Sequence, residues 1–237
     1  MKVKIQTQPD DVSCGPTCLK AIYDYYLDDK ELTVLMKEVE KSISGGTLAS
    51  FLGNHALKNN YDVKIYVYNL DVFDPSWFSR KLNKNKLIEK LKAQVNYKSD
   101  NKRVVESSNA YIDFLNNGGE IVYKNLTPNV LKQLFKEKHP IITGLSATYL
   151  YNTSREFTDE STNKSIYDDL KGEACGHFVV LTGYNEKHNR IIVADPHREN
   201  PISHNNYYEV CVTRLINSIM LGVITYDANL IVISPRK

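Results

Sequence analysis

The junction between an N-terminal polar loop and the first expected helix reads Gln8-Pro9-Asp10-Asp11-Val12-Ser13-Cys14-Gly15-Pro16-Thr17-Cys18-Leu19. Ser13 is the expected N-cap, because apolar residues recur between positions 17 and 26 at the spacing of one helical face. Cys14 then lies in the first helical turn, where unpaired backbone N–H groups and the helix dipole favour the thiolate. We therefore predict that Cys14 is a nucleophile. Its own N–H and the side-chain amide of Gln8 are the expected donors to an oxyanion.

A cysteine nucleophile needs a base, and a third group must orient that base. The segment 176–184 reads as a buried strand entered at His177, and a polar turn joins it to a second strand at 191–194. Asp195 follows that second strand directly. In an antiparallel hairpin the start of one strand lies beside the end of the next. We therefore predict that Asp195 accepts the imidazole N–H of His177 while the other ring nitrogen faces Cys14.

Five blocks of the chain, in this order, resemble the C39-like branch of the papain-like cysteine peptidases. They are Cys-Gly-Pro-Thr-Cys at 14–18, Gly-Gly-Thr at 45–47 before a helix at 48–58, a strand near 63–68, Pro-Ile-Ile-Thr-Gly-Leu at 140–145, and Gly-His-Phe-Val-Val-Leu-Thr-Gly-Tyr at 176–184 with the Val-Ala-Asp-Pro that follows it. Together they cover about half of the chain. The resemblance implies an α+β papain-like fold with an N-terminal helical side packed on a C-terminal antiparallel sheet.

The same resemblance implies a reaction and a site. Its catalytic residues would be Cys14, His177, Asp195 and Gln8, and its substrate-binding residues would be Gly45, Gly46, Thr47 and Tyr149. The expected activity is that of a cysteine peptidase or amidase, which cleaves a peptide or isopeptide bond through a thioester, with no metal and no organic cofactor. With an amine in place of water as the acceptor, the same residues would serve a transpeptidase or peptide ligase. The expected substrate is a small peptide or a protein tail.

Length and composition limit the number of domains and the classes of partner that the chain can have. The 237 residues are 42% hydrophobic and 24% charged, which fits one domain over 1–237. A net charge of +2 indicates neither a nucleic-acid nor a membrane partner, and it says nothing of the oligomeric state. The sequence has no run of eighteen apolar residues and no apolar N-terminal segment of the kind found in signal peptides. We therefore expect a soluble, cytoplasmic chain with its four cysteines reduced.

Two polar regions interrupt the family blocks. Residues 74–117 predict a helical insertion, because one apolar stripe accompanies many lysines, which we interpret as a solvated face and not a nucleic-acid site. The segment 149–172 has no clear period and is an expected lid or flap, from which Tyr149, Tyr151 and Arg155 could reach substrate. His55 falls on the expected exposed side of the helix at 47–58.

Two alternatives remain open on the sequence alone. Cys14 and Cys18 could join Cys175 and His177 in a zinc site, although this reading lacks the Cys-x-x-Cys spacing and leaves two of the family positions unexplained. The chain could also be a recognition domain that keeps the fold without the chemistry. Cys18 is expected to be structural, Cys211 falls in a strand pattern, and Cys175 could lie near the cleft.

Overall fold

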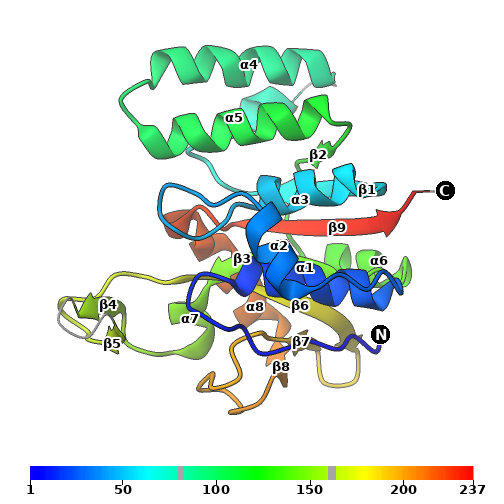
Figure 1. Cartoon of the computed structure of the whole chain (residues 1–237), viewed down its shortest axis with the longest axis vertical. Helices are drawn as coiled ribbons and strands as arrows, with labels where there is room; N and C mark the ends of the chain where they lie inside the picture. The colour runs from blue at the N-terminus through cyan, green and yellow to red at the C-terminus, as the bar shows by residue number, and fades with distance from the viewer. Residues whose placement is uncertain (80–82, 160–163, 237) are drawn as a thin grey trace.

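The computed structural model describes residues 1–79, 83–159 and 164–236. A seven-stranded sheet in the order β2-β1-β9-β3-β6-β7-β8 runs through the middle of the molecule (Figure 1). Its strands are β1 (Tyr61–Val67), β2 (Glu120–Val122), β3 (Ile141–Ser146), β6 (Gly176–Asn185), β7 (Arg190–Ala194), β8 (Tyr207–Cys211) and β9 (Asn229–Pro235). Neighbouring strands pair antiparallel except for β1 and β2, which pair parallel.

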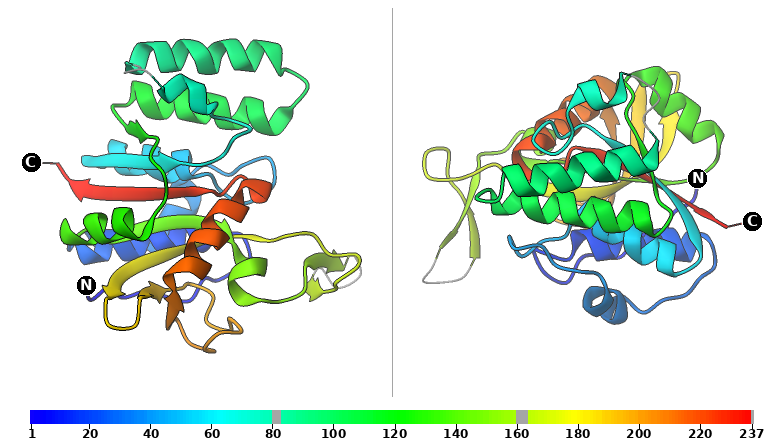
Figure 2. Two further views of the ribbon diagram at one scale, coloured as in Figure 1. Left: turned by 180° about the vertical axis from the view of Figure 1, so that it is seen from behind. Right: turned by 90° about the horizontal axis from the view of Figure 1, so that it is seen from above.

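Helices cover both faces of this sheet. The helices are α1 (Cys14–Tyr25), α2 (Leu32–Glu38), α3 (Ala49–Lys58), α4 (Lys84–Tyr97), α5 (Lys102–Asn116), α6 (Pro128–Lys136), α7 (Ala147–Tyr151) and α8 (Val212–Leu221), with short 3-10 turns η1 (Pro75–Phe78) and η2 (Gly222–Thr225). Helices α1 and α3 pack on one face, while α6 and α8 pack on the other, where Figure 2 shows them from behind. No helix in the described ranges is long and apolar enough to cross a membrane.

The central strand β6 shows why the sheet is buried on both sides. Phe178 and Val180 enter the core shared with α1, whereas Val179 and Leu181 enter the core shared with α8. Successive side chains of a strand point to opposite faces, so a strand that is covered twice needs an unbroken apolar run. The fold class expected from the sequence is confirmed: an α+β chain whose N-terminal helices pack on a largely antiparallel sheet, most of whose strands come from the C-terminal half, with β1 from the N-terminal half.

The segment 74–117 contains η1 and the antiparallel pair α4 and α5, which stands at the top of Figure 1. The predicted amphipathic helix is confirmed in α4, whose Leu87, Ile88 and Leu91 are buried while its lysines are exposed. Asn83 and Asn101 cap the two helices through their side chains. Residues 80–82 lie outside the described residues, and the reading of this segment as an insertion into one domain stays a prediction.

The expected position of His55 is wrong. His55 is buried, with Nδ1 2.8 Å from the hydroxyl of Tyr23 and Nε2 3.0 Å from a carboxylate oxygen of Glu38. The apolar pattern indicated the face of α3 that meets the sheet, but α1 packs on a second face of the same helix, and Glu38 at the end of α2 reaches His55 there. His55 therefore joins three helices through polar contacts.

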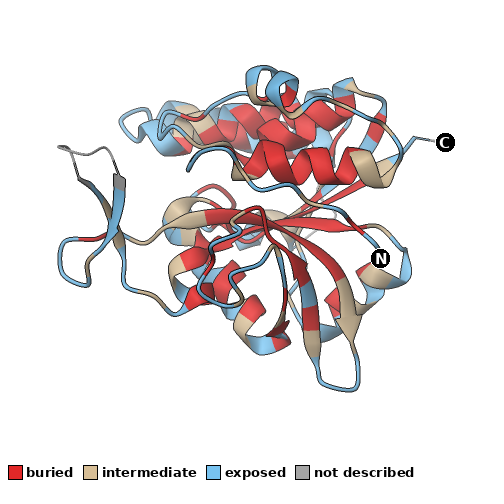
Figure 3. Cartoon of the chain, turned by 60° about the horizontal axis from the view of Figure 1, so that its bottom comes forward, coloured by how far each residue is buried: buried red, intermediate tan, exposed pale blue. Residues whose placement is uncertain are grey.

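The segment 149–172 is also more ordered than its sequence predicted. It contains the end of α7 and a two-stranded hairpin of β4 (Glu156–Asp159) and β5 (Lys164–Tyr167), which projects from the body of the molecule (Figure 3). The hairpin is largely exposed, so its strands lack the apolar alternation by which strands are recognised. Residues 160–163 lie outside the described residues. A role as a lid or flap stays a prediction.

Candidate active site

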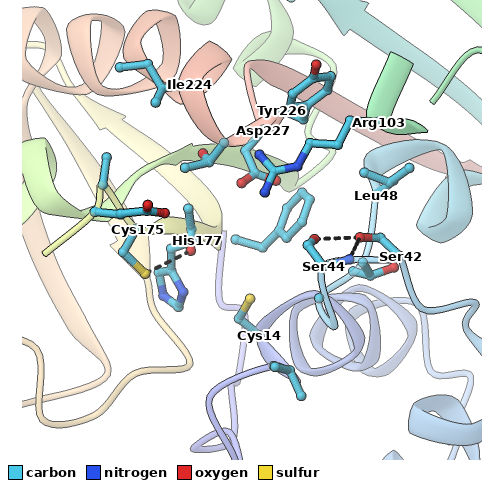
Figure 4. A pocket seen from close by; sticks show the side chains of 18 of the residues that line it. Cys14, Ser42, Ser44, Leu48, Arg103, Cys175, His177, Ile224, Tyr226 and Asp227 are labelled. Carbon is cyan, nitrogen blue, oxygen red and sulfur yellow. Dashed lines mark hydrogen bonds between the residues drawn. The ribbon is translucent and has the colours of Figure 1, made fainter. Parts of the chain in front are cut away.

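A cavity of about 690 Å³ opens where the first residue of α1, the start of β6 and the turn between η2 and β9 meet (Figure 4). Cys14, Cys175, His177 and Asp227 lie on its wall, and Arg103 reaches it from α5. The cavity thus collects side chains that are far apart in the sequence. The packing of α1 on β6 is the contact that brings its two halves together.

Cys14 is the first residue of α1, and its side chain is half-buried. This position leaves the unpaired N–H groups of the first helical turn near the thiol. Ser13 is the N-cap residue, as expected, but the expected side-chain cap is absent, because its hydroxyl donates to the carbonyl of Asp10, 3.1 Å away. The serine therefore fixes the loop before the helix and leaves the helix N-terminus open toward the cavity.

The strongest polar contact of the site joins His177 to Asp195. Nε2 of the imidazole lies 2.8 Å from Oδ1 of Asp195, and that carboxylate is fully buried. The same oxygen accepts a hydrogen bond from the backbone N–H of His197 at 2.8 Å. The other oxygen, Oδ2, accepts hydrogen bonds from the hydroxyls of Tyr151 at 2.8 Å and Tyr208 at 2.7 Å. A buried carboxylate with all these donors is held both in place and in its charged form.

These contacts set the charge of the ring. Burial opposes the imidazolium, but the charge and hydrogen bond of Asp195, together with the hydrogen bond and charge of Cys14, raise the pKa of His177 to about 10. Burial likewise opposes the carboxylate, yet the charge of His177 outweighs it and holds the pKa of Asp195 below its ordinary value. Since Asp195 occupies Nε2, Nδ1 is the ring nitrogen left for Cys14. Figure 4 shows the two side chains facing each other.

A family model described as the Peptidase_C39 like family matches residues 1–215. The chain belongs to this family. The resemblance seen in the sequence is therefore confirmed.

Two solved structures also match the chain. One is the peptidase domain of Streptococcus ComA, a bi-functional ABC transporter involved in a quorum sensing pathway, with 14% identity, a TM-score of 0.46 and 99% of each chain covered. The other is a Bacillus anthracis protein described as a C39-like peptidase, with 14% identity, a TM-score of 0.46, and 100% of this chain and 96% of that chain covered. Comparison with the curated proteins gave no significant match.

Gln8 lies beside this C39-like site but is not among the side chains on the cavity wall. Its backbone N–H donates to the carbonyl of Pro196 at 2.9 Å, which ties the loop to the residue after Asp195. Its side-chain amide donates to the carbonyl of Asp10 at 2.9 Å, and its Oε1 is buried without a partner. One N–H of the Gln8 side-chain amide is therefore used in a hydrogen bond within the loop. Its role as an oxyanion donor stays a prediction.

The four predicted substrate-binding residues separate into two pairs. Gly46 and Thr47 line the cavity, whereas Gly45 and Tyr149 do not. The ring of Tyr149 lies against the guanidinium of Arg214, 5.2 Å from its centroid, on the side of α8. The loop at 46–47 therefore lines the same cavity as Cys14, whereas the side chain of Tyr149 packs against Arg214 of α8 and does not line the cavity.

Sequence reasoning missed two tyrosine contacts and one carboxylate. Tyr208 lies in a strand that was expected, and its inward position next to Val193 could have been inferred from the period-two alternation of β8. Tyr151 was considered for substrate contact, whereas its hydroxyl bonds Asp195. Asp227 lies in the turn before β9 and has no neighbouring motif, so no sequence signal pointed to it.

The residues considered for a zinc site do not converge. Cys18 is fully buried, and its thiol donates to the carbonyl of Phe178 at 3.2 Å, so it belongs to the core as expected. Cys175 lies at the cavity, and burial, with the charges of Glu156 and Cys14, raises the pKa of its thiol to about 12. In the part of the chain that the structure describes, no three His, Cys, Asp or Glu side chains are grouped to hold a metal.

Gly176 leaves room for the side chains of Asp227 and Thr225. A Cβ at this position would overlap Oδ2 of Asp227 and lie 2.7 Å from Oγ1 of Thr225. We expect Gly176→Ala to lower the free energy of unfolding by about 1–3 kcal/mol, measured by urea denaturation. Gly46→Ala is the matched control, because a Cβ there meets nothing within 4 Å. Equal stability of the two variants would contradict this account of the packing.

Proposed function

We propose that this protein is a cysteine peptidase or amidase that cleaves a peptide or isopeptide bond through a thioester on Cys14. The observation that carries the proposal is the 2.8 Å contact between His177 Nε2 and Asp195, which leaves the other ring nitrogen for the thiol. Membership of the Peptidase_C39 like family supports the same reading. Both the nucleophile and its base are held on elements of the core, as a site that must be pre-organised requires.

The proposed reaction has two steps. The Cys14 thiolate attacks the amide carbonyl carbon, and the carbonyl π electrons move to the oxygen, where the Cys14 N–H and the Gln8 amide would stabilise the charge. His177 gives its proton to the leaving amine as the C–N bond breaks, which leaves the thioester. Water then loses a proton to His177 and attacks the thioester, and the Cys14 thiolate leaves.

The proposed substrate is a peptide or a protein tail, because the cavity is open to solvent and mixes polar with apolar side chains. We propose the cytoplasm as the place of action. Cysteines without disulfides are usual in the reducing cytoplasm, and the four cysteines of this chain are all free. An amine acceptor would turn the same thioester into a new amide bond.

Trapping of the acyl-enzyme tests the proposal. We expect wild-type protein mixed with a defined peptide library to cleave a subset of the peptides and to carry a hydroxylamine-labile acyl group on Cys14, read by intact-mass and peptide mass spectrometry. Cys211→Ser is the matched control, since Cys211 is exposed and far from the cavity wall. Acylation that persists in a Cys14→Ala variant would overturn the assignment. Added glycinamide would show whether an amine competes with water.

The pH profile gives a second expected result. Because the folded pKa of His177 is raised to about 10, the general acid stays protonated through neutral pH and is lost only as the pH rises through about 10. The alkaline limb of kcat/KM should therefore lie near pH 10 in the wild type and move to lower pH in Asp195→Asn, which removes the carboxylate charge. Circular dichroism at each pH controls for unfolding. A wild-type limb near pH 7 would contradict the proposed pair.

A further inference from the structure

A second carboxylate faces the cavity, and the proposed reaction does not use it. Asp227 lies between η2 and β9, and its side chain is only 8% exposed. Its Oδ2 occupies the space that Gly176 leaves open, immediately before His177. Figure 4 shows Asp227 across the pocket from Cys14.

Asp227 has no charged partner among the described residues. No lysine or arginine lies within ion-pair distance of its carboxylate in the part of the chain that the structure covers. The hydroxyl of Thr225 approaches the carboxylate, but it donates its proton to the carbonyl of Gly222 at 3.1 Å. Arg103 lines the same cavity, with its guanidinium 5.7 Å from the ring centroid of Tyr226. The carboxylate therefore lies nearly buried at the cavity wall, and no described cation is in ion-pair contact with it.

The surroundings of Asp227 explain its charge state. Burial raises the pKa of Asp227 to about 7, and Thr225 and the charge of His177 on β6 offset this only in part. The other titratable groups near it are Cys175 before β6 and Tyr111 on α5, and the charge of Asp227 raises the pKa of each of them. The carboxyl is therefore partly protonated at neutral pH, and a bound cation would favour its charged form.

The rest of the cavity has the same sign. Asp11, Glu106 and Glu173 line it together with Asp227, and its cations are Arg103, Arg155 and the imidazolium of His177. The His177 charge is matched by the thiolate proposed at Cys14. The carboxylates therefore outnumber the two arginines, and a cavity of this sign attracts positively charged ligands.

We propose that Asp227 is a specificity-determining residue that binds an ammonium or guanidinium group of the substrate close to the scissile bond. The inference rests on the proposed function, in which Cys14 attacks that bond. The substrate class would then be peptides or protein tails with lysine, arginine or a free amine beside the cleaved amide. Burial makes an unpaired carboxylate charge unfavourable in free energy. A substrate cation that forms an ion pair with this carboxylate would offset that cost and add charge-assisted hydrogen bonds.

Charged thiol reagents test the proposal without a known substrate. The probes are 2-(trimethylammonium)ethyl methanethiosulfonate, which is permanently cationic, and methyl methanethiosulfonate, which is neutral. In both reactions the Cys14 thiolate attacks the reagent's sulfenyl sulfur, a disulfide forms and methanesulfinate leaves. The measured quantity is the ratio of the cationic to the neutral rate at Cys14, with the site of modification read by peptide mass spectrometry. We expect Asp227→Asn to lower this ratio on the order of tenfold.

The control is Glu173→Gln, which removes an exposed carboxylate from the same cavity wall. It should lower the ratio much less than Asp227→Asn does, because solvent screens an exposed charge. An unchanged ratio in Asp227→Asn, or equal losses in both variants, would overturn the role of Asp227. If the neutral reagent modified Cys14 equally fast in the wild type and in His177→Ala, the proposed nucleophile would fail instead, and the two failures are thereby told apart.

The pH dependence of the same rate ratio in the wild-type protein tests the proposal even if Asp227→Asn does not fold. The ratio should rise between about pH 6 and pH 8, as the carboxyl of Asp227 ionises. The neutral reagent corrects for the titration of Cys14 itself, and His177, with its pKa of about 10, keeps its charge over this range. A ratio that stays flat over this range would contradict the proposal.

Discussion

Cys14→Ala is expected to abolish amide cleavage and leave the fold nearly unchanged. The variant removes the atom that would form the thioester, and loss of a nucleophile of this kind lowers turnover by roughly 10⁴-fold or more. The thiol is half-buried at the first residue of α1, so little packing is lost. Turnover would be measured on a peptide found in the library screen, and stability by thermal denaturation.

A control variant at another cysteine shows whether the loss of turnover is specific to Cys14 or follows from the removal of any thiol. Cys211→Ala removes an exposed cysteine from the end of β8 and should retain wild-type turnover. Cys14→Ser keeps the shape of the side chain but replaces the thiolate by a weak nucleophile, so it should be nearly as inactive as Cys14→Ala. Activity that survives in Cys14→Ala would refute the nucleophile assignment.

Asp195→Ala is expected to cause the largest loss of stability. It would leave the ring of His177 and the hydroxyls of Tyr151 and Tyr208 without their shared acceptor in the interior. Loss of one partner from a buried charged pair costs about 3–5 kcal/mol. Urea denaturation measures this loss. Turnover should also fall, but less than in His177→Ala, because the imidazole itself remains.

Two control variants set the scale for the loss of stability expected in Asp195→Ala. Tyr208→Phe removes one donor to Asp195 and should cost only about 1 kcal/mol, whereas Asp62→Ala removes an exposed acid that pairs with Arg236 and should cost less still. A loss in Asp195→Ala no larger than in Asp62→Ala would contradict the buried network. Equal loss of stability in His177→Ala and Asp195→Ala would point to a structural role for the pair.

The parts of the fold that the sequence predicted are those with strong local patterns. The helix after Ser13, the strand that begins near His177 and the hairpin that ends before Asp195 each follow from apolar period and turn residues. Because a hairpin fixes which residues of its two strands are neighbours, the contact of His177 with Asp195 could be predicted from spacing. The approach of Cys14 to His177 depends on the packing of α1 on β6, and only the chemistry that a thiol nucleophile needs and the family resemblance pointed to it.

The parts that could not be predicted depend on tertiary packing or on weak local signals. His55 is buried because α1 packs on the polar side of α3 and Glu38 of α2 contacts the ring, which no periodicity within α3 reveals. The β4–β5 hairpin has short, largely exposed strands and therefore no apolar alternation. Asp227 reaches the cavity from a turn far along the chain, at a place where Gly176 makes room for it.

Alkylation of Cys14 is the most direct test of the thiolate–imidazolium pair. Native protein and His177→Ala would be labelled with iodoacetamide across a range of pH, and the labelled cysteines read by peptide mass spectrometry. The account predicts that Cys14 reacts selectively below about pH 7, where an ordinary thiol of pKa near 8.5 is mostly protonated, and that this selectivity falls without His177. Equal labelling of the four cysteines in the native protein, or selectivity that survives in His177→Ala, would contradict it.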